Sequence, residues 1–160
     1  MDINPTIEAL RSSPERFRDA IQSIPAEALR WSDGGWSITA ILTHLAFSEV
    51  FYGERFRYMV QHNNQPIFIF TSERVPVGGH PNIAADELMR RWQKERAELC
   101  RWLTTLLRTD WESVAIHPER QQVTLLDEAR SMLAHDDEHL AQVMQVYNAW
   151  QARFQSRRSV

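Results

Sequence analysis

The strongest constraint on the fold is a stretch near the C-terminal end, residues 124–150, that carries two histidines four residues apart. Its apolar residues recur at spacings of three and four, the pattern of a helix that faces a core; they are Leu126, Ala129, Met132, Leu133, Leu140, Val143, Met144, Val146, Tyr147 and Trp150. Residues four apart lie one turn above each other on a helix. The pattern therefore places His135 and His139 together, on or beside the buried face.

A histidine pair on an apolar face needs an explanation, because buried polar groups have partners. Hydrogen-bonded core histidines are one explanation, and a shared metal ion is the other. The sequence HDDEH at residues 135–139 is similar to the His-Glu-x-x-His pattern of zinc proteases, with Asp136 in place of the glutamate. No His, Asp or Glu follows His139. A third ligand of the usual type must therefore come from earlier in the chain.

Three more helices are expected, at residues 5–23, 37–62 and 84–107. Gly is scarce at 5 residues and Pro at 7, so long helices are permitted. Asn4 before Pro5 is a plausible cap for the first helix, and Ser37 for the second. We predict one all-α domain over residues 1–160. Trp31 and Trp36 flank a glycine-containing turn and are expected to plug one end of the bundle.

The second predicted helix supplies the missing ligand candidate. His44 lies at the edge of its apolar arc. A lone histidine there would be a packed core residue, but beside the two on the last helix it becomes the natural third ligand. Glu49 and Tyr52 on the same helix are weaker site candidates.

Residues 63–82 form a connection that is long for a compact domain. Its length would let the chain return along the bundle, so that the second and third helices run parallel. The apolar run of residues 67–70 would then lie against the bundle, or else form a lid or a dimer contact. His80 is expected to be an ordinary loop residue, and residues 109–123 to be a second connection.

The composition is that of a soluble globular protein, with 43% hydrophobic residues, 24% charged residues and a net charge of -3. Nucleic-acid binding is disfavoured, because no global positive charge would attract phosphates. No basic, apolar leader and no run of ~18 apolar residues are present, so neither secretion nor a membrane span is expected. The single cysteine, Cys100, is read as a small core residue. These features fit a cytoplasmic location.

Three stretches in this order resemble the DinB-like (DinB/YfiT) superfamily of metal-binding four-helix bundles. They are Trp36-Ser37-Ile38 leading to His44-Leu45, the histidine pair followed by Leu140 and Gln142, and, more weakly, His117-Pro118 before the last helix. The resemblance implies an up-down-down-up bundle, a divalent metal held by His44, His135 and His139, and a homodimer.

Three imidazoles leave at least one metal position open, as in catalytic sites. Zinc suits these ligands, and nickel and iron are compatible with them. The open position could acidify water for hydrolysis or bind a thiolate, so the resemblance implies either a hydrolase or a transferase that uses a low-molecular-weight thiol. Asp136 is a candidate to orient an imidazole or carry a proton, with an exposed capping role as the alternative. A small-molecule substrate is expected; the competing hypothesis is a non-enzymatic bundle that binds a metal or small ligand.

Overall fold

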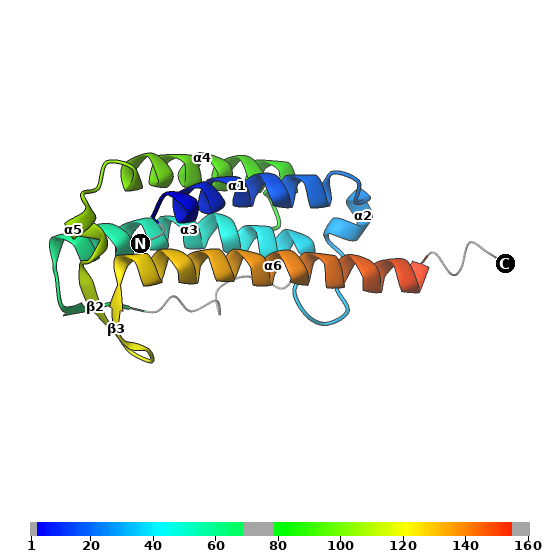
Figure 1. Cartoon of the computed structure of the whole chain (residues 1–160). Coiled ribbons are helices and arrows are strands. Elements are labelled where there is room, and N and C mark those ends of the chain that lie inside the picture. The colour runs from blue at the N-terminus through cyan, green and yellow to red at the C-terminus, as the bar shows by residue number, and fades with distance from the viewer. Residues whose placement is uncertain (1–2, 69–78, 155–160) are drawn as a thin grey trace.

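The computed structural model describes residues 3–68 and 79–154 and has four long helices with two short ones between them (Figure 1). The long helices are α1 (Ile3–Ile21), α3 (Ile38–Gln61), α4 (Ala85–Leu103) and α6 (Leu125–Phe154); the short ones are α2 (Ala26–Leu29) and α5 (Arg108–Trp111). None of the helices in these described ranges is long and apolar enough to cross a membrane. The predicted all-α class is confirmed.

The bundle is up-down-down-up, as predicted. In Figure 1, α1 and α6 run in one direction while α3 and α4 both run in the other. Helix α3 packs against α4 and α6, and α1 packs against the same two helices. The long connection of residues 63–82 exists because α3 and α4 are parallel and the chain must return before α4 begins.

Side chains at the helix starts explain two boundaries. Ser37 accepts a hydrogen bond from the backbone N–H of Ala40, which fixes the start of α3. Thr124 and Asp127 cap each other's backbone N–H groups at the start of α6. The cap predicted at Asn4 is wrong, because α1 already includes Ile3 and Asn4 is inside the helix.

A small sheet that we did not predict lies beside the helices. It consists of β1 (Gln65–Pro66), β2 (Val114–His117) and β3 (Gln121–Thr124). Strand β2 pairs parallel with β1 and antiparallel with β3. The prediction that residues 109–123 are only a connection is therefore wrong: they contain most of α5 and a β-hairpin that leads directly into α6.

The structure describes only Ile67 and Phe68 of the apolar run at residues 67–70, which was predicted to lie against the bundle. Ile67 is buried in the core, whereas Phe68 is 84% exposed. Packing against the bundle therefore holds for Ile67 and not for Phe68, and residues 69–78 lie outside the described residues. His80 is a loop residue, as expected, and its backbone N–H donates to the hydroxyl of Thr43.

The hydrophobic core consists of two groups of side chains, one toward each end of the bundle. One group contains Phe56, Leu99 and Met132, and the other contains Leu45, Trp92 and Val143. On α3, α4 and α6 alike, a short segment separates the members of one group from those of the other. Glu49, Arg96, His135, Asp136 and His139, which are described below, lie in these middle segments, and His44 lies just before the one on α3.

Candidate metal centre

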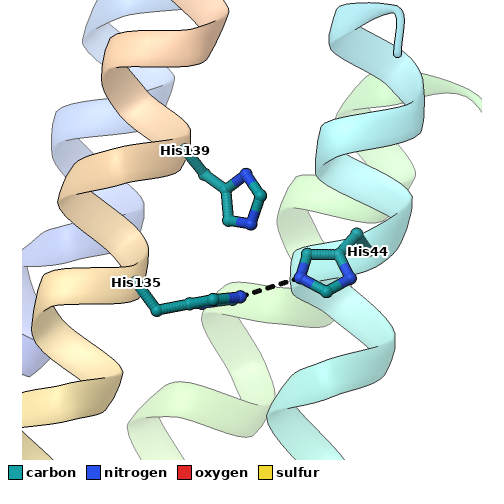
Figure 2. A group of neighbouring side chains, drawn as sticks. All are labelled: His44, His135 and His139. Carbon is teal, nitrogen blue, oxygen red and sulfur yellow. Dashed lines mark hydrogen bonds between the residues drawn. The ribbon is translucent and has the colours of Figure 1, made fainter. Parts of the chain in front are cut away.

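Three histidines from two helices meet at the middle of the bundle. His44 comes from α3, and His135 and His139 come from successive turns of α6; Figure 2 shows their rings turned toward one another. One ring nitrogen from each lies within 4.8 Å of the others. The Nε2 atoms of His44 and His135 are 2.8 Å apart and share a hydrogen bond. The structure thus brings together all three residues predicted from the sequence.

Burial keeps these imidazoles neutral. Burial and then the neighbouring histidines lower the pKa of His44 to about 3, and burial followed by His139 and Arg96 lowers that of His135 to about 4. Burial also lowers the pKa of His139, although Gln142 partly opposes this. Each ring therefore has one nitrogen lone pair at neutral pH, the form that binds metal ions.

Gln142 orients one of the rings. Its side-chain Oε1 lies 2.9 Å from Nδ1 of His139. An amide oxygen only accepts, so Nδ1 carries the proton and the lone pair is on Nε2. Such a hydrogen bond to the far nitrogen is usual for metal-binding histidines. In the sequence Gln142 is part of the motif that follows the histidine pair, and its spacing of three residues from His139 on one helix is the signal for this contact.

The donor set fits a small divalent cation. Zinc binds imidazole nitrogen at about 2.0–2.1 Å, which places tetrahedral ligands about 3.4 Å from one another. The ring nitrogens of the three histidines lie between 2.8 Å and at most 4.8 Å from one another, a range that includes this ligand–ligand distance. His44, His135 and His139 are thus the residues that would hold the ion.

The cluster faces an open pocket of about 390 Å³. Trp36 forms one part of its wall, with its indole stacked on His139 at 6.0 Å and tilted on His44 at 5.1 Å between ring centroids. Trp36 packs against the core group of Leu45 and Val143, as expected for a residue at the end of the bundle, but it also lines the site, which was not predicted. Trp31 instead packs edge-on against Phe154 near the end of α6.

Asp136 is buried, with its side chain 1% exposed, so it is not an exposed cap. Both of its oxygens accept hydrogen bonds from Arg96, at 2.7 and 3.3 Å. Its Oδ1 lies 4.0 Å from Nδ1 of His135, which is beyond hydrogen-bond distance. The carboxylate is next to a histidine of the cluster but is held by the arginine.

Arg96 on α4 is a buried residue that the sequence analysis overlooked. Its guanidinium binds both oxygens of Glu49 on α3, both of Asp136 on α6, and the backbone carbonyl of Leu10 on α1. One side chain therefore connects all four long helices. Burial opposes the charge of Arg96, but the carboxylates of Glu49 and Asp136 outweigh it and raise its pKa. Glu49, a weaker site candidate, is thus committed to this network and to Trp92.

Tyr52, the other weaker candidate, does line the pocket. Its ring centroid lies 5.8 Å from that of His135, and the guanidinium of Arg55 lies over its face. Burial raises the pKa of Tyr52, so its hydroxyl keeps its proton at neutral pH. The pocket also contains His117, Glu119 and Arg120 from the hairpin, which sequence reasoning did not place in the site.

The fold and the site together define a class: a four-helix bundle with a three-histidine cluster at the base of a pocket. The DinB superfamily matches this chain over residues 9–143, so the chain belongs to the DinB superfamily. The resemblance inferred from the motifs is confirmed.

A solved structure agrees with the fold. It is described as "YfiT from Bacillus subtilis is a probable metal-dependent hydrolase with an unusual four-helix bundle topology". It superimposes with a TM-score of 0.80 over 92% of this chain and 87% of that one, at 18% sequence identity. Among curated proteins, no sequence matches this chain significantly.

Proposed function

We propose that this protein is a metal-dependent hydrolase of a small molecule, with His44, His135 and His139 holding a divalent ion. The observation that carries the proposal is that the cluster faces an open pocket of about 390 Å³ and is not enclosed in the core. A pocket of this size suits a small substrate. The description of the Bacillus subtilis protein as a probable metal-dependent hydrolase supports the same reaction class.

When bound, the ion would supply Lewis acidity and would lower the pKa of a coordinated water to near neutral. The chain supplies the rest. Gln142 keeps the His139 lone pair on Nε2, and Trp36 covers both His139 and His44 on the pocket side. Burial holds all three imidazoles in the neutral form. The open pocket favours this function over a non-enzymatic bundle with a structural metal, because structural metal sites are closed by protein ligands. Turnover in the assay below distinguishes it from a non-enzymatic bundle that binds a small ligand.

We expect zinc, and nickel and iron suit the same ligands. Thiol-dependent transfer stays a prediction, because a thiolate could take the same open position. The homodimer and the cytoplasmic location implied at the sequence level also stay predictions.

Elemental analysis of protein purified without a metal-chelating column tests the metal site. We expect close to one metal ion per chain in the wild type, and loss of that metal in His44→Ala and His135→Ala. His62→Ala is the matched control, because His62 is an exposed histidine at the end of α3 outside the cluster. Unchanged metal content in His135→Ala would contradict the three-histidine assignment.

Hydrolysis is then measured on the metal-loaded protein with simple aryl esters, with and without an added low-molecular-weight thiol. Turnover that needs the metal but no thiol supports the hydrolase. If turnover required the thiol, the proposed reaction would be transfer to the thiol and not hydrolysis. A wild type that stays metal-free after supplementation with zinc, nickel and iron would refute both.

A further inference from the structure

The β2–β3 hairpin contributes polar side chains to the same pocket as the three histidines. His117 ends β2, and Glu119 and Arg120 form part of the turn before β3. The hairpin is held against the bundle, since the side chain of Arg120 binds Glu128 on α6. These residues have no part in holding the metal, so their presence in the pocket needs another explanation.

His117 is locked in one neutral tautomer. Its Nδ1 accepts hydrogen bonds from the backbone N–H groups of Glu119 and Arg120, both at 3.1 Å. The proton is therefore on Nε2, which becomes a hydrogen-bond donor. Burial and then the charge of Arg120 lower the pKa of His117, which favours this neutral form. His117 is a buried residue, 5% exposed, that lines the pocket, and no residue within 3–68 or 79–154 accepts a hydrogen bond from its Nε2.

Two arginines that line the pocket, Arg55 and Arg120, share one buried carboxylate. Arg55 and Arg120 both pair with Glu128, whose side chain is 0% exposed. Two guanidinium groups therefore share one negative charge. Glu119 also lines the pocket but forms no ion pair with either arginine in the described structure. Arg120 is 37% exposed at its side chain, so some of its N–H groups can still reach a ligand.

We propose that His117 and Arg120 form an oxyanion-binding subsite next to the three histidines, so that the substrate carries a carboxylate or phosphate group. A guanidinium matches either group with parallel N–H donors, and the Nε2–H of His117 adds a donor of fixed direction. This inference rests on the proposed function, because it specifies the substrate of that site. The metal would act on the bond to be cleaved while the subsite holds the anionic group.

Binding to metal-free protein tests the subsite without a contribution from the ion. Benzoate, phenyl phosphate and neutral benzamide are titrated into the full chain by isothermal calorimetry. We expect at least one anion to bind about tenfold or more tightly than benzamide, and the better of the two identifies the group. Arg120→Gln should lower the affinity for that anion by about 10- to 100-fold, the usual effect of losing a charge-assisted hydrogen bond. His117→Phe should also lower the affinity for that anion, while the affinity for benzamide should stay unchanged.

Arg101→Gln is the control, because Arg101 is an exposed arginine of α4 outside the pocket. Arg120→Gln leaves Glu128 paired with Arg55, and circular dichroism checks its folding. The proposal would be overturned if the anions bound no more tightly than benzamide, or if neither anion bound. It would also be overturned if Arg120→Gln and Arg101→Gln lowered the anion affinity equally.

The metal-loaded enzyme gives a second readout that separates the two proposals. The ratio of kcat/KM for 4-acetoxybenzoate to that for phenyl acetate should exceed one and fall in Arg120→Gln. A protein that lacks metal and turnover but prefers anions refutes the hydrolase and leaves the subsite intact. A protein that hydrolyses both esters equally and shows no anion preference refutes the subsite alone.

Discussion

Replacing Arg96 with methionine should destabilise the protein more than almost any other single change. The substitution keeps an unbranched side chain of similar length but removes all five N–H donors. Glu49 and Asp136 would then be left as carboxylates with side chains 2% and 1% exposed. Glu49 would keep only the indole N–H of Trp92 as a donor, and Asp136 would lose all of the hydrogen bonds described for it.

Breaking a buried ion pair by removing one partner costs about 3–5 kcal/mol. We expect Arg96→Met to lower the free energy of unfolding by this amount, which is a large part of the about 5–15 kcal/mol that stabilises a typical domain. For a chain of this size the melting temperature should fall by about 6–20 °C. Urea unfolding followed by circular dichroism measures the change. Arg101→Met, on the exposed side of the same helix, should change stability by no more than about 0.5 kcal/mol.

The loss in Arg96→Met should also depend on pH. Burial raises the pKa of Glu49 even with Arg96 present. A carboxyl whose pKa is raised by folding stabilises the folded state below its unfolded pKa, and this contribution is lost as pH rises through the folded pKa. Without Arg96 the pKa of Glu49 rises further. The variant should therefore approach wild-type stability as the pH falls from about 8 to about 5.

Neutralising both carboxylates in the same chain tests the cause directly. Arg96→Met combined with Glu49→Gln and Asp136→Asn should recover part of the lost stability at neutral pH, because no unpaired charge remains. The reasoning would be refuted if Arg96→Met were within about 1 kcal/mol of the wild type. It would also be refuted if the added amide substitutions gave no recovery.

Three smaller predictions concern single contacts. Gln142→Leu should weaken zinc binding by about 10- to 100-fold in competition with a colorimetric chelator, while Gln145→Leu, exposed on the same helix, should not; equal effects would contradict the orienting role. Burial raises the pKa of Cys100 to about 11, so at pH 8 its thiol should react with Ellman's reagent only after unfolding, and a fast native reaction would disprove this. Thr124→Ala should cost about 1 kcal/mol in urea unfolding by removing the cap of α6, and an unchanged midpoint would count against it.

The sequence predicts the bundle and the histidine cluster because both depend on helical periodicity. His135 and His139 share a face by their spacing alone, and His44 falls at the edge of an apolar arc on another helix. The length of the connection before α4 is sufficient to indicate parallel helices. These features depend on the pattern of residues and not on the detail of side-chain contacts.

The features that sequence reasoning missed depend on contacts between distant residues. Arg96 lies on the same face of α4 as Trp92 and Leu99. An arginine is buried on such a face only when carboxylates pair with it, and here these come from other helices, which the sequence of α4 does not reveal. The hairpin was missed because each of its strands has only four residues. Consequently the sequence does not place His117 and Arg120 in the pocket, although His117 belongs to the weak motif before the last helix.

The order in which the chain is made also matters for the cluster. His44 and His135 are 91 residues apart, and α6 is the last helix of the described structure. During translation, His44 is the only one of the three imidazoles present until α6 has been synthesised, and all three meet only when α6 packs against α3. An ion held by all three would bind the folded chain and not the nascent or unfolded one, adding about 4 kcal/mol of stability at a thousandfold excess over its Kd. The lifetime of the protein in a cell would then follow the supply of the metal.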